Sequence, residues 1–130
     1  MKKIIFISMV ITMMGCSKQQ CDLDRADAIK PKLTIIAPAK SESYSTGAPL
    51  CFKGDVIDGS SLKTVKLLLF NINDLNTPII HYSYPVSERS IYIEQKMIIP
   101  PGLSGQCVLQ FEATDFYNNR AVTTLNFSSN

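Results

Sequence analysis

The sequence predicts an all-β fold over residues 33–130, a sandwich of two antiparallel sheets. Beyond Leu33 the chain is a series of short runs rich in Val, Ile, Leu, Tyr, Phe and Thr, and Pro, Gly, Asn or Ser separates one run from the next. Runs of this length and spacing are typical of sandwiches. No long segment shows the period of an amphipathic helix. Seven strands are expected, at 33–37, 49–57, 63–72, 79–84, 90–99, 106–114 and 121–128.

Turn-forming residues separate these predicted strands. Residues 47–49 and 58–61 connect the first three strands. Pro100 closes the fifth strand, because proline cannot donate a hydrogen bond to a ladder. Asn118 and Asn119 connect the last two strands, and asparagine tolerates the left-handed conformation that tight turns require.

Alternation along the strands assigns an inner and an outer face to each of them. Along 106–114 and 49–57, the apolar or small side chains fall on every second position, and the polar side chains fall mostly between them. The residues expected to face the core are Leu50, Phe52, Gly54, Val56, Cys107, Leu109, Phe111 and Ala113.

The strand at 63–72 differs, because both of its faces are apolar. One face carries Val65, Leu67 and Leu69, and the other carries Leu68, Phe70 and Ile72. Two interpretations follow. Either a loop or neighbouring strand covers the second face, or Leu68, Phe70 and Ile72 form an exposed apolar surface that contacts a partner.

The N-terminus predicts an export signal over residues 1–15. Lys2 and Lys3 precede a mostly apolar run of 11 residues, Ile4 to Met14. That run is too short to span a bilayer, which needs about 20 residues. A basic start followed by an apolar run of this length is typical of a signal peptide.

The end of this signal resembles the lipobox of bacterial lipoproteins, in the residues Met13-Met14-Gly15-Cys16. The resemblance implies that Cys16 becomes the acylated N-terminus of the mature chain. It also implies a lipid-anchored protein of the bacterial cell envelope, with the outer membrane as the expected site. Residues 16–32 are polar and lack hydrophobic periodicity, so they are expected to form a flexible tether.

The turns of the predicted sandwich carry a second resemblance. The motifs Phe52-x-Gly54-x-Val56-x-Asp58 and Ala113-x-Asp115, the latter followed by Asn118-Asn119, are similar to those of bacterial immunoglobulin-like domains. The resemblance implies a seven-stranded antiparallel immunoglobulin-like sandwich like those of small Gram-negative lipoproteins. Such motifs support a fold and carry no chemistry.

The cysteines leave the disulfide pairing open. With Cys16 acylated, Cys21, Cys51 and Cys107 remain in an oxidising compartment, where at most one intramolecular bond forms among the three. Cys51 and Cys107 occupy the second and sixth strands, the pair that antibody domains bridge. Cys51 nevertheless shares its phase with outward Lys53. The alternatives are a Cys21–Cys51 bond or a free Cys51.

The acidic side chains admit a metal-binding and a structural interpretation. Asp58 and Asp115 end strands that run in the same direction, so both are expected at the end of the sandwich where the tether emerges. Together they could ligate calcium. The favoured interpretation is that each caps its own turn. An enzyme built on this chain would depend on carboxylates alone, such as Asp55, Asp58 and Asp115.

His81 and three tyrosines also admit a functional and a structural interpretation. His81 is the single histidine, and no serine or cysteine can be assigned to it by spacing, so we expect a packed or surface residue. Tyr82, Tyr84 and Tyr92 either stack against a sugar or peptide or serve as good strand formers, and the second is favoured.

These observations predict a non-catalytic protein. The chain has 13 basic and 11 acidic residues, and removal of Lys2 and Lys3 leaves 11 of each, without the basic patch of a nucleic-acid binder. No cofactor or metal is expected. We expect a membrane-anchored binding or accessory module that recognises a protein or glycan through its sheet faces or the end opposite the tether. The alternative is a structural subunit of an envelope complex that docks through Leu68, Phe70 and Ile72, and an enzyme ranks third.

Overall fold

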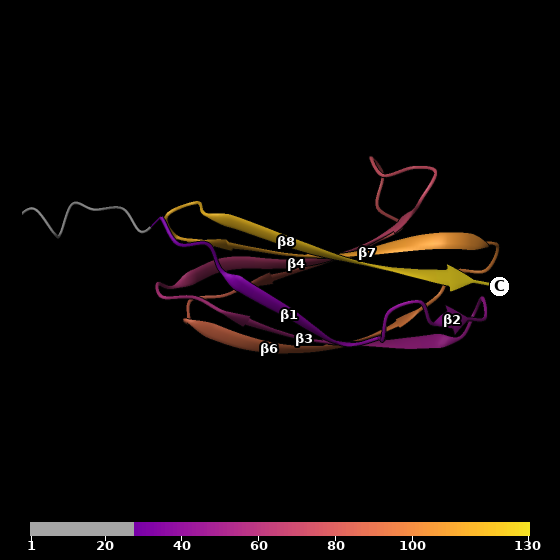
Figure 1. Ribbon diagram of the computed structural model, residues 1–130, viewed down its shortest axis with the longest axis horizontal. Helices are drawn as coiled ribbons and strands as arrows, with labels where there is room; N and C mark the ends of the chain where they lie inside the picture. The colour runs from indigo at the N-terminus through magenta and orange to yellow at the C-terminus, as the bar shows by residue number, and fades with distance from the viewer. Residues whose placement is uncertain (1–27) are drawn as a thin grey trace, which may run out of the picture.

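Two β-sheets packed face to face form the protein in the computed structural model, which describes residues 28–130 (Figure 1). The expected signal peptide, Cys16 and Cys21 lie outside the described residues. The strands in chain order are β1 (Lys32–Ala37), β2 (Ser43–Tyr44), β3 (Pro49–Ile57), β4 (Leu62–Asn71), β5 (Ile80–Pro85), β6 (Ser90–Ile98), β7 (Gly105–Asp115) and β8 (Arg120–Ser129).

The strands divide into a three-stranded sheet A and a five-stranded sheet B. Sheet A has the order β1-β3-β6, and sheet B has the order β2-β8-β7-β4-β5. Every pair is antiparallel except β2–β8, in which Ser43 and Tyr44 pair in parallel with Ser128 and Ser129. The all-β sandwich is therefore confirmed, and the seven expected strands agree with seven observed strands to within one residue at each end. Strand β2 is an eighth strand that was not predicted, because two residues are too few to show an alternating pattern.

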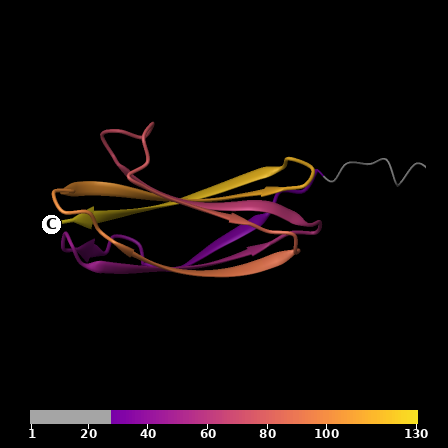
Figure 2. The same cartoon turned by 180° about the vertical axis from the view of Figure 1, so that it is seen from behind.

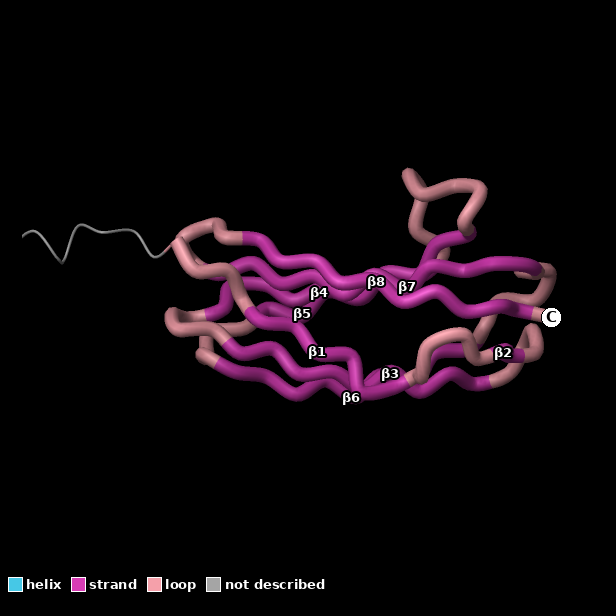
Figure 3. Tube along the Cα trace, in the orientation of Figure 1, coloured by secondary structure: helices cyan, strands magenta, loops and turns pink. Residues whose placement is uncertain are grey.

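The core lies between the two sheets, as Figure 3 shows along the chain trace. All eight residues expected to face inward are buried. The rings of Phe52 and Phe111 meet edge to face at the centre, with centroids 4.9 Å apart. Gly54 lies beneath them, where a Cβ atom would come within 2.7 Å of Phe52 Cζ and 2.9 Å of Phe111 Cε1. Glycine is therefore required there because two aromatic rings occupy the space of a side chain.

The outer face of β4 is covered at Leu68 and Phe70, so of the two interpretations of this face the covered one is correct there and the partner surface is wrong. Leu68 and Phe70 are only 8% and 7% exposed, and they form a second apolar cluster with Val108 of β7. Val108 lies directly across from Phe70 in the β4–β7 pair, so a cross-strand neighbour supplies this cover. Ile72 stays 42% exposed at the start of the β4–β5 loop, which rises on this side of sheet B (Figures 1 and 2).

The two ends of the sandwich differ in what they carry. The described chain enters at one end, here called the N-terminal pole, together with the β3–β4, β5–β6 and β7–β8 turns (Figures 1 and 2). The C-terminus lies at the opposite end, the C-terminal pole, where Thr46 N–H donates to the Asn130 carbonyl over 2.9 Å. The turns containing Asp58 and Asp115 thus share the end at which β1 begins, as strand direction predicted. Residues 28–130 contain no helix long and apolar enough to cross a membrane.

Candidate functional site

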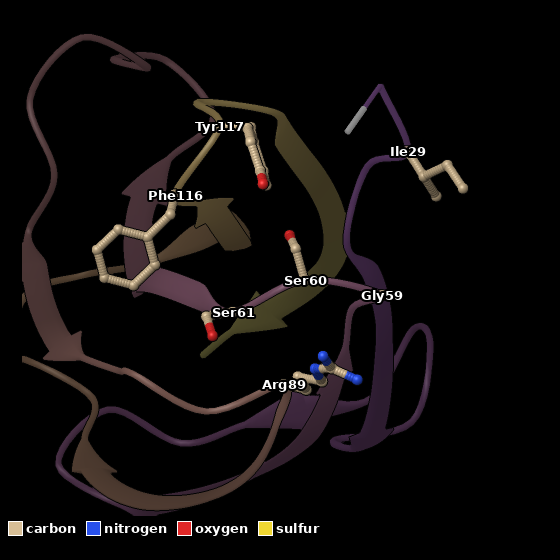
Figure 4. A pocket seen from close by; sticks show the side chains of 7 residues that line it. All are labelled: Ile29, Gly59, Ser60, Ser61, Arg89, Phe116 and Tyr117. Carbon is tan, nitrogen blue, oxygen red and sulfur yellow. The ribbon is translucent and has the colours of Figure 1, made fainter. Parts of the chain in front are cut away.

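An open groove of about 630 Å³ occupies the N-terminal pole. Its walls come from all three turns and from the segment that precedes β1. Figure 4 shows Ser60 and Tyr117 pointing toward the middle of the groove, with the Arg89 guanidinium at one side. The lining residues are Ile29, Gly59, Ser60, Ser61, Arg89, Phe116 and Tyr117.

Backbone hydrogen bonds join the three turns to one another. Phe116 N–H donates to the Ser61 carbonyl over 3.1 Å, which ties the β7–β8 turn to the β3–β4 turn. Asp58 N–H donates to the Arg89 carbonyl over 2.8 Å, and Leu62 N–H donates to the Glu88 carbonyl over 2.8 Å. These two bonds tie the β3–β4 turn to the β5–β6 turn. The pole is therefore a connected platform, and its loops are not independent of one another.

Asp115 sets the shape of the β7–β8 turn. Its Oδ1 accepts hydrogen bonds from the backbone N–H groups of Tyr117 (2.8 Å) and Asn119 (2.9 Å), and its Oδ2 accepts one from Asn119 Nδ2 (2.9 Å). Asn118 adopts a left-handed φ of 63° at the tip, as its residue type predicted. The carboxylate is fully buried, so these bonds replace the water that it loses on folding.

Asp58 plays a similar part in the β3–β4 turn. Its Oδ2 accepts hydrogen bonds from Ser60 Oγ (2.6 Å) and Ser60 N–H (3.3 Å), while Oδ1 is buried without a hydrogen-bond partner in the described structure. The capping interpretation of Asp58 and Asp115 is thus confirmed. Within residues 28–130 no group of three or more His, Cys, Asp or Glu side chains is placed to hold a metal ion.

Two consecutive aromatic side chains project from the β7–β8 turn. Phe116 is 55% exposed and Tyr117 is 52% exposed, because the bonds to Asp115 hold their backbone at the tip of the turn. Ile29 beside them is 70% exposed. Sequence reasoning passed over these residues, although a pair of aromatic residues between Asp115 and Asn118 in an otherwise polar turn is the signal that would have found them.

Glu112 and Arg120 form an ion pair close to this pole. Arg120 donates to Glu112 Oε2 over 2.7 Å, and Gln110 Nε2 donates to the same oxygen over 3.2 Å. The hydrogen bond from Arg120 lowers the pKa of the Glu112 carboxyl, although burial opposes this effect. The Glu112 carboxylate is therefore charged, and its hydrogen bonds hold Arg120 and Gln110 in place.

The structure does not gather the remaining candidates into one site. Tyr82 and Tyr84 pack against the core, and Tyr84 Oη donates to Gln95 Oε1 over 2.6 Å. Burial raises the pKa of the Tyr84 hydroxyl. Tyr92 is exposed on the outer face of sheet A, opposite Asp55, so these tyrosines do not form one stacking surface. His81 is exposed on β5, across from Leu68.

The candidate Cys51–Cys107 disulfide is wrong for this structure, in which both cysteines are free. Cys51 is exposed on the outer face of sheet A, with its Sγ 3.8 Å from Glu94 Oε1, while Cys107 is buried in the core. The reason is strand parity, because side chains of β3 and β7 can meet only when both point inward. The Cys21–Cys51 bond stays a prediction, since Cys21 lies outside the described residues.

We expect the two described cysteines to differ in the rate at which their thiols react. In a Cys21→Ser chain, a disulfide-exchange reagent should modify Cys51 rapidly and Cys107 only after unfolding. Cys107 is fully buried, and burial raises the pKa of its thiol, which lowers the thiolate fraction. Peptide mapping after timed labelling measures the two rates.

A second substitution, Cys51→Ser, is the control, and it should abolish the rapid phase without affecting the slow one. A tryptic fragment that links Cys51 to Cys107 in the native protein would contradict this prediction. A fragment that links Cys21 to Cys51 in the parent chain would support the alternative pairing.

Comparison with known proteins supports the fold and nothing finer. No family model matches the chain, and no curated protein matches it either. Wild-type OgpA from Akkermansia muciniphila is similar in structure, with a TM-score of 0.56 and 11% identity over 78% of this chain and 28% of that chain. A single-residue variant of the superoxide reductase (neelaredoxin) from Ignicoccus hospitalis has a TM-score of 0.53 and 12% identity, over 78% of this chain and 80% of that chain. The chain thus spans under a third of OgpA.

Proposed function

We propose that this chain is a lipid-anchored, non-catalytic module of the bacterial envelope with an immunoglobulin-like sandwich. The lipobox-like residues ending at Cys16 support the anchor. The observation that carries the proposal is that the described chain enters at the pole opposite the C-terminal pole, so a tether from Cys16 would join the sandwich there (Figure 1). With the tether that the sequence predicts for residues 16–32, the average span between Cys16 and Lys32 would be about 20–25 Å. The sheet faces and the C-terminal pole then remain open to a protein or glycan partner.

A structural subunit of an envelope complex is the second proposal, and one observation favours it. The β4–β5 loop exposes three apolar side chains on one side of sheet B, namely Ile72, Leu75 and Ile79. Leu68 and Phe70 are covered, so docking would use this loop. Loss of co-purification with a membrane protein in a Leu75→Asp chain would favour this proposal over the first.

Changing the acylated residue tests the anchor. We expect a Cys16→Ser chain to lack acyl groups and to retain residues 1–15, because serine offers no thiol for the diacylglyceryl transfer on which cleavage depends. Intact-mass spectrometry of the purified proteins measures both changes. Cys21→Ser is the matched control and should be processed and acylated like the parent. Normal processing of Cys16→Ser would contradict the proposal.

A further inference from the structure

Three exposed apolar side chains border the groove at the N-terminal pole, namely Ile29, Phe116 and Tyr117. Scattered apolar residues are normal on a protein surface, whereas a cluster at one end marks an interaction surface. Ile57 and Tyr92 are also exposed near this end, but they lie on the outer face of sheet A.

Several basic side chains lie near these apolar residues. Lys30, Lys32, Lys63 and Arg89 are exposed at or beside the three turns, and Arg120 opens β8. Asp58 and Asp115 are buried in their turns, and Glu112 is paired with Arg120. Glu88 in the β5–β6 turn is exposed, and Asp55 near the end of β3 is half-buried. Among the described residues of this pole, exposed basic side chains therefore outnumber exposed carboxylates.

This combination, together with the direction of the chain, indicates a lipid surface. Aromatic side chains favour the boundary between headgroups and acyl chains, and lysine and arginine favour anionic headgroups. The described chain begins at this same pole, so a lipid anchor at Cys16 would keep it at an average distance of about 20–25 Å from the bilayer. Because the anchor keeps the pole near the bilayer, the pole would meet the lipid headgroups at a high effective concentration.

The rigidity of the pole favours such docking. The hydrogen bonds to Asp115 fix the backbone of Tyr117, and the bond from Phe116 N–H to the Ser61 carbonyl fixes the turn against its neighbour. Little conformational freedom is lost when a surface is already ordered.

We propose that the N-terminal pole docks on an anionic phospholipid surface, with Phe116 and Tyr117 in the headgroup boundary and Arg89 and Lys30 on the phosphates. This inference rests on the lipid anchor proposed above. Docking would stand the sandwich upright on the membrane and close the groove against it. The C-terminal pole and the β4–β5 loop would then be directed away from the bilayer (Figure 1).

Single tryptophan reporters test this orientation, because the chain contains no tryptophan. The full acylated protein is reconstituted into vesicles of phosphatidylglycerol and phosphatidylethanolamine, with or without brominated acyl chains. In a Tyr117→Trp chain we expect a blue-shifted emission that brominated lipid quenches. Ser104→Trp, an exposed position in the β6–β7 loop, is the matched control and should be unaffected.

Further substitutions in the Tyr117→Trp chain test the contributions of apolar and basic groups. Phe116→Asp and Arg89→Glu should each reduce the quenching, and the effect of Arg89→Glu should disappear in vesicles of phosphatidylcholine alone. Leu75→Asp replaces an equally exposed apolar residue that lies away from the pole, and it should leave the quenching unchanged.

Vesicle flotation distinguishes failure of the docking from failure of the anchor. A parent protein that does not float with vesicles would overturn the anchor and the docking together. A Tyr117→Trp protein that floats while its tryptophan stays unquenched would overturn the docking alone. A third outcome is that the tryptophan emission of the same chain changes with a soluble chito-oligosaccharide and not with vesicles. That result would overturn the docking and would make the groove a glycan site.

Discussion

Replacing Phe111 by alanine is expected to lower the free energy of unfolding by about 3–5 kcal/mol, the largest effect of any single substitution considered for this chain. Phe111 is completely buried between the sheets and packs edge to face against Phe52 at 4.9 Å. The substitution removes the ring and leaves a cavity that the surrounding strands fill only in part. Because many domains are stable by only about 5–15 kcal/mol, urea unfolding followed by circular dichroism should show a clearly lower midpoint.

Phe116→Ala is the matched control, because it removes the same ring from a position that is 55% exposed. Its midpoint should stay close to that of the parent. Equal loss of stability in the two variants would show that burial of the Phe111 ring is not the cause.

Gly54 offers a second test of the same packing. Gly54→Ala alone should cost about 1–3 kcal/mol, because the new methyl group meets the rings of Phe52 and Phe111. In a chain that already carries Phe111→Ala, the added cost should be smaller, since one of the two rings is gone. Strict additivity of the two substitutions would contradict the proposed clash.

Replacing Asp115 by alanine is expected to cost about 2–4 kcal/mol, since each hydrogen bond to a charged group contributes about 1.5–3 kcal/mol and water partly replaces those that are lost. The buried carboxylate accepts three hydrogen bonds within the β7–β8 turn. Its loss leaves the Tyr117 and Asn119 N–H groups without their acceptor. Urea unfolding measures the cost, and hydrogen exchange at residues 116–119 should accelerate.

Asp74→Ala is the control for this prediction. Asp74 also accepts two backbone hydrogen bonds, from Asn76 and Thr77, but its turn is exposed, so water can replace the lost acceptor. A cost well below about 1 kcal/mol is expected for an exposed polar substitution. If Asp115→Ala were no more destabilising than Asp74→Ala, the bonds between the turns would be sufficient to hold the pole.

Much of the fold could be predicted from the sequence, because the relevant signals are local. Alternation of apolar and polar residues assigned Leu109 and Phe111 to the core, and turn-forming residues marked the strand ends. The capping roles of Asp58 and Asp115 also depend on residues within four positions along the chain. Signals of this kind need no knowledge of which strands become neighbours.

The candidate site was predicted less well, because it is assembled from turns that are distant in the sequence. The meeting of Ser61, Arg89 and Phe116 at one pole depends on how both sheets stack. The turns at 58–61 and 115–119 were expected at the same end, but their aromatic and basic side chains were not recognised as one surface.

By itself the sequence determined the strands, their inward faces and the turns that connect them, because side-chain period and turn chemistry act over a few residues. Only the tertiary structure decided that Leu68 and Phe70 are covered. Val108 lies across from Phe70 once β4 pairs with β7, which converts an expected docking face into a covered one. The direction of Cys51, by contrast, follows from alternation along β3, because Cys51 shares the outward phase of Lys53. Neighbours across sheets and between strands are a property of the packed chain, and no local pattern specifies them.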